Sequence, residues 1–268
     1  MLHFVTSVNE NLFEKYGARA FREFEAYSDR SIRLHVVFEG DLPKTLPLYE
    51  NVNFITFHSP EHRDFLAKFG HLHEANGLRI KAYLENGVQK VNLSWDYRYN
   101  AVRFSFKIFS ITQVLRSIAD SSHLVWLDAD IRVLSPFNYT DLIPFLPADG
   151  ELMAYLGRQN FPKPNAYSEA GWLAFNLNHP DINNFLSFVS DQYTSGKIFS
   201  QAEWHDSWIW DVARVNFESK GTRFKNISGA LMDCEHPFIN CGLGRYFDHL
   251  KGPERKELGR SPSRDVMR

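Results

Sequence analysis

The stretch that decides the fold is His123-Leu-Val-Trp-Leu-Asp-Ala-Asp-Ile-Arg-Val-Leu134. Its apolar run from Leu124 to Leu127 is typical of a buried strand. Asp128 and Asp130 follow that run at once, and carboxylates are costly to bury without a partner. In an extended segment the side chains of residues i and i+2 point to the same side, so these two charges would repel each other.

A divalent cation between the two aspartates would remove this repulsion, because oxygen ligands suit Mg²⁺, Mn²⁺ and Ca²⁺. The pattern therefore predicts that Asp128 and Asp130 bind a metal and have no partner within the protein. The alternative is a solvated strand end in which Asp130 pairs with Arg132. Asp-x-Asp is too short a motif to decide between the two.

The hydrophobic pattern around this stretch alternates between strands and helices. Strands are predicted over 2–6, 32–38, 52–57, 124–127, 152–157, 172–177 and 222–227, and helices over 13–27, 103–119, 181–193 and 203–217. Strand, helix and strand within the first 60 residues favour a parallel sheet of the nucleotide-binding type. We expect an α/β fold in one domain, residues 1–250, with a mixed, mainly parallel sheet flanked by helices.

Two other segments are less regular. Residues 58–100 are expected to hold helices and a long loop, and this segment and 158–170 are expected to shape the substrate pockets. Residues 251–268 are polar and basic, so we predict either a disordered tail or a lid that orders when an anion binds.

Composition limits the function classes. The chain has 268 residues, 44% of them hydrophobic, and a formal net charge of −2, which argues against a protein that coats nucleic acid or an anionic membrane. No apolar run approaches the roughly 18 residues of a transmembrane helix, and the N-terminus lacks the pattern of a signal peptide. Cys234 and Cys241 are the only cysteines, which suits a reducing compartment, so a cytoplasmic location is expected.

Basic residues accompany the aspartates. Arg103 and Lys107 lie four apart and so share one face of a predicted helix that is otherwise largely apolar. Cations beside carboxylates are the composition expected where carboxylates hold a metal and cations offset phosphates. The alternative is that both pair with acids elsewhere on the surface. Near the C-terminus, His249 could ligate a transition ion, with Lys251 and Lys256 adding positive charge.

Five segments, taken in order, resemble a known family. They are FVTSVNE, RFSFKIFSI, VWLDADIRVL, EAGWLAFNL and HLKGPERK. Together they are similar to the GT-A glycosyltransferases that include glycogenin and the bacterial lipopolysaccharide galactosyltransferases. Departures occur after Gly252, where Lys256 comes one residue late, and before Gly171, where this chain has Glu169 in place of a frequent Asn. The resemblance implies a Rossmann-like GT-A fold.

What the resemblance implies about function is specific. It implies a metal-dependent transferase that moves a hexose from a nucleoside diphosphate sugar, UDP-linked, to a hydroxyl of a glycan, lipid-linked or protein acceptor. Mn²⁺ or Mg²⁺ would be held by Asp128, Asp130 and His249. Contacts to the donor are expected from Thr6, Asn9, Arg103, Lys107, Asp128, Lys251 and Lys256. A homodimer is a candidate assembly, and no nucleic-acid partner is expected.

Two further carboxylates are expected near the sugar. Asp206 and Glu169 are the candidates for an acceptor-activating base in an inverting enzyme, or for support of the oxocarbenium face in a retaining one. The retaining outcome is favoured. Their ordinary alternatives are a helix-start carboxylate for Asp206 and a loop charge for Glu169. His205 is a weaker candidate for an acceptor contact.

Other functions were compared with this one. A phosphatase using Asp-x-Asp needs Thr or Val where Arg132 stands, and a calcium loop needs Asx and Gly where Arg132 and Val133 stand. A zinc site from Cys234, His236 and Cys241 fits no common spacing. A non-catalytic nucleotide-sugar or glycan-binding protein on the same fold is the alternative from a different class.

Overall fold

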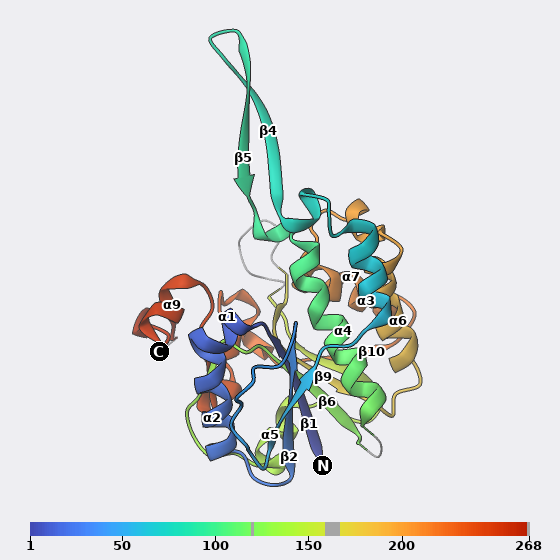
Figure 1. The fold of residues 1–268 in the computed structure, drawn as a ribbon. Helices are drawn as coiled ribbons and strands as arrows, with labels where there is room; N and C mark the ends of the chain where they lie inside the picture. Colours follow the sequence, from blue (N-terminus) through green and yellow to red (C-terminus); the bar gives the residue numbers. More distant parts are fainter. Residues whose placement is uncertain (119–120, 159–166, 267–268) are drawn as a thin grey trace.

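The computed structural model describes residues 1–118, 121–158 and 167–266, and its centre is a seven-stranded sheet with the order β10-β8-β9-β6-β1-β2-β3 (Figure 1). The strands are β1 (Leu2–Val8), β2 (Ile32–Phe38), β3 (Val52–Thr56), β6 (His123–Leu127), β8 (Glu151–Leu156), β9 (Glu169–Asn176) and β10 (Arg223–Asn226). Only β9 runs antiparallel to its neighbours, and the other four pairings are parallel. The predicted mixed, mainly parallel sheet in one α/β unit is confirmed.

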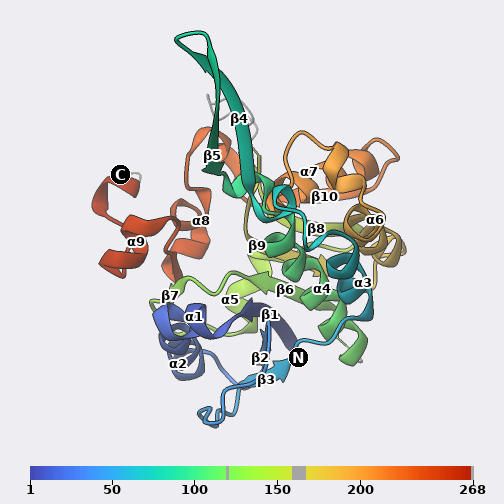
Figure 2. The same ribbon diagram turned by 45° about the horizontal axis from the view of Figure 1, so that its top comes forward.

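Helices cover both faces of the sheet (Figure 2). The helices of the described chain are α1 (Glu10–Leu12), α2 (Ala18–Tyr27), α3 (Pro60–Phe69), α4 (Ala101–Ser117), α5 (Tyr139–Leu142), α6 (Ile182–Thr194), α7 (Asp206–Glu218), α8 (Pro237–Asn240) and α9 (Pro253–Leu258), of which α9 lies to the side of the sheet. Two apolar cores result. One packs α2 and α8 against the sheet, and the other packs α3, α4, α6 and α7 against the opposite face.

Strand β1 shows how the sequence separates these cores. Successive side chains of a strand point to opposite faces, so Phe4 packs in the core under α2 while Val5 packs in the core under α4. The register of pairing also determines which strand ends lie next to each other. β1 pairs with β2 from Leu2 to Val8 and with β6 from His3 to Val5. The carboxyl ends of β1 and β6 therefore lie side by side.

The position of β1 also marks where a ligand is expected. From β1 the chain continues to β2 and β3 on one side, whereas β6, β9 and β8 lie on the other side. In open α/β sheets, ligands bind beyond the carboxyl ends of the strands at such a switch in strand order. Asp128 follows the end of β6, so the sequence motif lies at this position.

Two small ladders lie outside the main sheet. Strand β7 (Ile131–Val133) pairs antiparallel with β11 (Phe247–His249), which brings the C-terminal segment against the Asp-x-Asp turn. Strands β4 (Leu78–Glu85) and β5 (Val88–Trp95) form a hairpin that projects from the body (Figure 1). The sequence prediction of helices and a long loop over 58–100 holds for α3 but is wrong for this hairpin.

Residues 251–266 contact the rest of the chain. The carboxylate of Asp248 accepts hydrogen bonds from the backbone N–H and the hydroxyl of Ser261, and an Arg132 guanidinium N–H donates to the carbonyl of Gly259. The division of the chain at residue 250 stays a prediction, and residues 267–268 lie outside the described part. None of the described helices combines the length and apolar composition needed to cross a bilayer.

Candidate metal and nucleotide site

Both aspartates at the end of β6 have partners within the protein, contrary to the sequence prediction. The indole N–H of Trp126 donates to Asp128 at 2.6 Å, and the Lys107 ammonium lies 3.0 Å from the same carboxylate. Asp130 forms an ion pair with Lys256 at 2.7 Å, not with Arg132, which instead pairs with Glu23. A compact turn between two strands cannot leave paired carboxylates without counter-charge, and helices α4 and α9 supply it.

The third member of this cluster arrives from strand β11. His249 Nε2 lies 3.5 Å from Asp128 Oδ2 and 3.5 Å from Asp130 Oδ1. The ligand atoms of all three residues lie within 4.8 Å of one another. The pairing of β11 with β7 produces this convergence, because His249 stands opposite Ile131, directly after Asp130. The predicted triad of Asp128, Asp130 and His249 is thus brought together.

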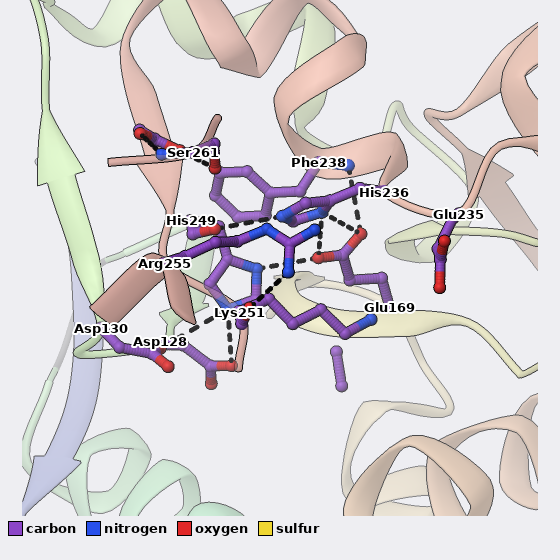
Figure 3. Close-up of polar contacts among 12 residues, drawn as sticks. Asp128, Asp130, Glu169, Glu235, His236, Phe238, His249, Lys251, Arg255 and Ser261 are labelled. Atoms are coloured by element: carbon purple, nitrogen blue, oxygen red, sulfur yellow. Dashed lines mark hydrogen bonds and ion pairs between the residues drawn. The ribbon is translucent and has the colours of Figure 1, made fainter. Parts of the chain in front are cut away.

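Glu169 lies behind His249, on the side away from the two aspartates (Figure 3). Its carboxylate accepts from Nδ1 of His249 at 2.8 Å, from Nδ1 of His236 and from the backbone N–H of Phe238. The other ring nitrogen of His236 contacts the carbonyl of His249 at 3.1 Å. A carboxylate on Nδ1 leaves Nε2 of His249 to face Asp128 and Asp130.

Gly171 explains why the neighbouring strand can approach so closely. A Cβ atom at this position would lie 2.7 Å from Cε1 of His249 and 2.9 Å from its Nδ1. The carbonyl of Gly171 also accepts the N–H of Asp128 at 3.0 Å. The Glu169-Ala170-Gly171 segment therefore holds His249 in place in two ways. The buried Glu169 carboxylate contacts its ring, and the lack of a side chain at Gly171 leaves room for that ring.

Lys107 links this cluster to Asp206. Its ammonium is buried and contacts three groups: Asp128, the carboxylate of Asp206, and the carbonyl of Ala170 at 2.8 Å. Asp206 is the first residue of α7, where a carboxylate is favoured by the helix dipole. A buried cation between two carboxylates explains why α4 carries Lys107 on a largely apolar surface.

The electrostatics of the cluster favour ionised carboxylates. Burial alone would raise the pKa of Asp128, but the Lys107 ammonium and the His249 ring outweigh it and lower the pKa below the usual range. The same balance holds for Asp206, whose pKa is lowered chiefly by Lys107 against burial. For Glu169, Lys251 and His236 overcome burial and hold the pKa well below its ordinary value.

Two cavities meet at the aspartates. A cavity of about 680 Å³ is lined by Asp128, Asp130, His249, Asp206 and His205 together with Lys251, Arg158 and the aromatic residues Trp95, Tyr97 and Tyr167. A second cavity of about 310 Å³ is lined by Asn9, Ser7, Glu39, Tyr16 and Lys107. Arg103 and Lys256 line both. Part of the segment 158–170, which was expected to shape the pocket, lies outside the described residues at 159–166.

Most, but not all, of the predicted donor-contacting residues reach these cavities. Asn9, Arg103, Lys107, Lys251 and Lys256 each line at least one of them. Thr6 does not. It is 1% exposed and lies with Phe21 and Phe24 under α2. The reason is the alternation of β1, which turns the even-numbered residues toward that core and turns Ser7 toward the cavity.

Several residues of the site were not recognised in the sequence. Ser7 donates to Glu39 at 2.7 Å, and both line the smaller cavity at the ends of the neighbouring strands β1 and β2. Burial raises the pKa of Glu39 despite the Ser7 hydrogen bond. The sequence could have indicated Ser7 and Glu39, because both stand at the carboxyl ends of predicted parallel strands, and such ends meet at one edge of a sheet. His236 gave no such signal, since its contact with Glu169 depends on the path of the chain after β10.

No family model matches the chain. The outer membrane usher protein CS3-2 of Escherichia coli is 26% identical over 169 residues, which make up 58% of this chain and 18% of the usher. The chain thus spans less than one fifth of the length of that curated relative.

Several solved structures align over most of the chain. An active-site variant of LgtC covers 98% of both chains at 16% identity, with a TM-score of 0.49. A glycosyltransferase involved in the glycosylation of the major capsid of PBCV-1 covers 96% of this chain and 98% of its own at 11% identity, with a TM-score of 0.48. The galactosyltransferase LgtC with donor and acceptor sugar analogues covers 94% and 87% at 18% identity, with a TM-score of 0.46.

Proposed function

We propose that the chain is a metal-dependent glycosyltransferase that moves a hexose from a nucleoside diphosphate sugar, UDP-linked, to a hydroxyl acceptor. One observation carries the proposal. The ligand atoms of Asp128, Asp130 and His249 lie within 4.8 Å of one another, where two cavities lined by cations meet. A pocket for a nucleoside on one side and a pocket for a sugar on the other fit this arrangement.

The residues present fit a divalent metal ion. Two carboxylates and one imidazole are a ligand set that Mn²⁺ accepts, and Mg²⁺ accepts the oxygens. His249 meets a further requirement of such sites, because its second ring nitrogen contacts the Glu169 carboxylate. When bound, the metal would act as a Lewis acid on the diphosphate leaving group.

Basic side chains of the chain itself would stabilise the negative charge of the diphosphate. Arg103 and Lys256 line both cavities, and Lys251 lines the larger one, so they can offset negative charge that grows on a diphosphate. Among the described residues Arg103 takes part in no ion pair, which leaves its guanidinium available to an anion. The positive charge that develops on the sugar in an oxocarbenium-like state needs a carboxylate on the opposite side.

Asp206 is our candidate for that carboxylate. It lines both cavities and is held ionised by Lys107. An ionised carboxylate can stabilise an oxocarbenium-like sugar in a retaining reaction, which we favour, or accept the acceptor's proton in an inverting one. Glu169 is better placed as a positioning residue, because all its named contacts go to His236, His249 and the backbone of Phe238.

The test is the turnover of a panel of nucleoside diphosphate sugars, with and without Mn²⁺, by the wild type, Asp128→Asn and Asp130→Asn. We expect metal-dependent release of the nucleoside diphosphate by the wild type and a loss of at least 100-fold in both variants. Metal-dependent nucleotide binding measured by calorimetry should weaken in parallel. Nucleotide binding that is unchanged in both variants would contradict the proposal.

A non-catalytic binding protein on the same fold is the second candidate. It predicts metal-dependent binding of a nucleotide sugar without release of product in any condition. Asp206 lines both cavities as an ionised carboxylate, and a negative charge beside the sugar is needed for transfer but not for binding alone, which favours catalysis.

A further inference from the structure

The hairpin of β4 and β5 carries a regular apolar face. Its register places Leu78 opposite Trp95, Ile80 opposite Leu93, and Ala82 opposite Val91. Asn86 and Gly87 form the turn, both with positive φ angles of 52° and 75°, as a two-residue hairpin turn requires. Because side chains alternate along a strand, these cross-strand pairs all lie on one face of the hairpin, which we call the arm.

This apolar face has no cover within the described chain. Ile80 is 58% exposed, Leu84 76%, Val91 60%, Leu93 60% and Trp95 57%. Strands β4 and β5 pair only with each other, and both views show the arm standing away from the sheet and its helices (Figures 1 and 2). A two-stranded hairpin is marginally stable in water by itself. An apolar patch of this kind on an otherwise well-packed chain marks an interaction surface.

The opposite face of the arm is more polar. It carries Arg79, whose guanidinium lies over the Tyr99 ring, and Lys90, which forms an ion pair with Glu85, together with Tyr83 and Val88. The sequence of the arm holds three basic residues, Arg79, Lys81 and Lys90, and one acidic residue, and so has a charge of +2, whereas the whole chain has a charge of −2. The overall charge, which argued against binding to an anionic membrane, therefore conceals a segment of the opposite sign.

We propose that the arm docks on the surface of a lipid bilayer that contains anionic headgroups. A segment with one apolar face and one face of Lys and Arg lies in the plane of the interface, with the apolar side chains at the level of the acyl boundary. The cations then lie at the level of the headgroups. Trp95 at the base of the arm and Tyr83 near its tip are residues of the type enriched at that interface.

A second copy of this chain is the competing occupant, and charge argues against it. Two arms packed face to face would cover the five apolar side chains, which are 57–76% exposed, but would offer no partner of opposite charge to the basic residues of the opposite face. A layer of anionic headgroups over apolar acyl chains offers a partner to both faces.

The apolar face of the arm is continuous with the large cavity, which determines how the chain would be oriented on a bilayer. Trp95 lies on the apolar face and also lines the large cavity, as does Tyr97 two residues later. An arm that lies on a bilayer would therefore place the mouth of this cavity at the lipid surface. The docking surface itself does not depend on the proposed sugar transfer, so each can fail without the other.

The experiment is flotation of the full chain with vesicles of phosphatidylcholine alone and with 30% phosphatidylglycerol. The wild type should float with the anionic vesicles, and at least tenfold less with the neutral ones.

Three variants test which face of the arm is responsible. Ile80→Thr/Leu84→Thr/Leu93→Thr keeps the strand propensity but removes the apolar face, and it should lose at least tenfold in vesicle binding. Lys81→Gln/Lys90→Gln should lose binding to the anionic vesicles only. Leu48→Thr, at a side chain that is 100% exposed outside the arm, is the matched control and should bind as the wild type.

The outcomes separate the occupants. Absence of wild-type flotation, or flotation that survives the triple substitution, overturns the proposal. A wild-type dimer in light scattering that the triple substitution converts to a monomer, without vesicle binding by either, assigns the face to a second copy and also overturns it. Nucleotide binding should be equal in all these variants, because none of the substituted residues lines either cavity.

Discussion

At the scale of single residues, the two aspartates differ in how firmly the protein holds them. Asp128 is paired with Lys107, whose side chain is 7% exposed, whereas Asp130 is paired with Lys256, whose side chain is 30% exposed. A partly exposed lysine on the short helix α9 can move aside at small cost, because its charge stays in water. Entry of a cation is therefore expected from the Lys256 side, with Lys107 and Asp128 staying in place.

Glu169→Gln distinguishes a positioning role from a catalytic one. The amide keeps the size of the side chain but removes the charge that holds Nδ1 of His249. We expect the affinity for Mn²⁺, measured by calorimetry without any sugar, to fall about 10–100-fold. The maximal turnover at saturating metal should change much less. A large loss of turnover with unchanged metal affinity would instead make Glu169 the catalytic carboxylate.

The sequence predicted the members of this site better than their partners. Asp128 and Asp130 were recognised because Asp-x-Asp after an apolar run is a local pattern, whereas His249 was assigned through the resemblance of HLKGPERK to a motif of a known family. The roles of Glu169 and Thr6 were not recognised, because they depend on what lies behind a residue. Strand alternation alone would have placed Thr6 in the core. No pattern in the sequence announces that His236 closes a hydrogen-bonded ring with Glu169 and His249.

At the scale of elements, helix α4 carries two cations with different roles. Arg103 stands in the first turn, exposed and beside both cavities, while Lys107 one turn later is buried between two carboxylates. The helical spacing predicted that both would share one face of the helix, and the resemblance implied that both would contact the donor. It could not predict that only one of them would be buried, since this depends on the start of α7 packing against α4.

Lys107→Met and Arg103→Gln should therefore separate stability from binding. Removing Lys107 leaves Asp128 and Asp206 buried without their shared cation, and we expect a loss of about 3–5 kcal/mol in the free energy of unfolding. Removing Arg103 should change that free energy by less than about 0.5 kcal/mol. Its effect should instead be a roughly tenfold weaker binding of a nucleoside diphosphate. Equal losses of stability in the two variants, measured by urea unfolding, would show that the cations do not differ in this way.

Elements that pack in the core were predicted more successfully than the exposed arm, for a physical reason. Strands such as β2 and helices such as α4 have long, regular apolar patterns that follow from burial against the sheet. The arm was missed although Asn86-Gly87 between alternating apolar residues is a strong hairpin signal. Its apolar residues face outward, so a prediction guided by burial gave them no place in the fold.

At the scale of the whole molecule, buried histidines that line neither cavity make stability depend on pH. His62, on α3, is 2% exposed and packs against the rings of Phe57, Phe106 and Phe109, with one hydrogen bond to Ser105. Removal from water disfavours the charged ring and lowers its pKa to about 4. Burial, with help from His3 and Arg33, does the same for His35.

The sign of the effect follows from proton binding. Between pH 6.5 and pH 4 the unfolded chain protonates His62 while the folded chain does not, so the unfolded state gains stability as the pH falls. The contribution of His62 is present above pH 6.5 and is lost as the pH falls toward 4. A shift of this size amounts to about 2 kcal/mol between pH 7.5 and pH 5.0.

His62→Phe should therefore lose less stability on acidification than the wild type. The phenyl ring suits the aromatic surroundings and cannot take up a proton, so the fall in unfolding free energy from pH 7.5 to pH 5.0 should shrink by about 2 kcal/mol. Urea unfolding at the two pH values measures it, with His71→Gln at an exposed position as the control. Loss of the hydrogen bond to Ser105 lowers stability at both pH values alike, so only the difference between them counts. A pH dependence identical to the wild type would mean that the folded chain protonates His62 as readily as the unfolded one.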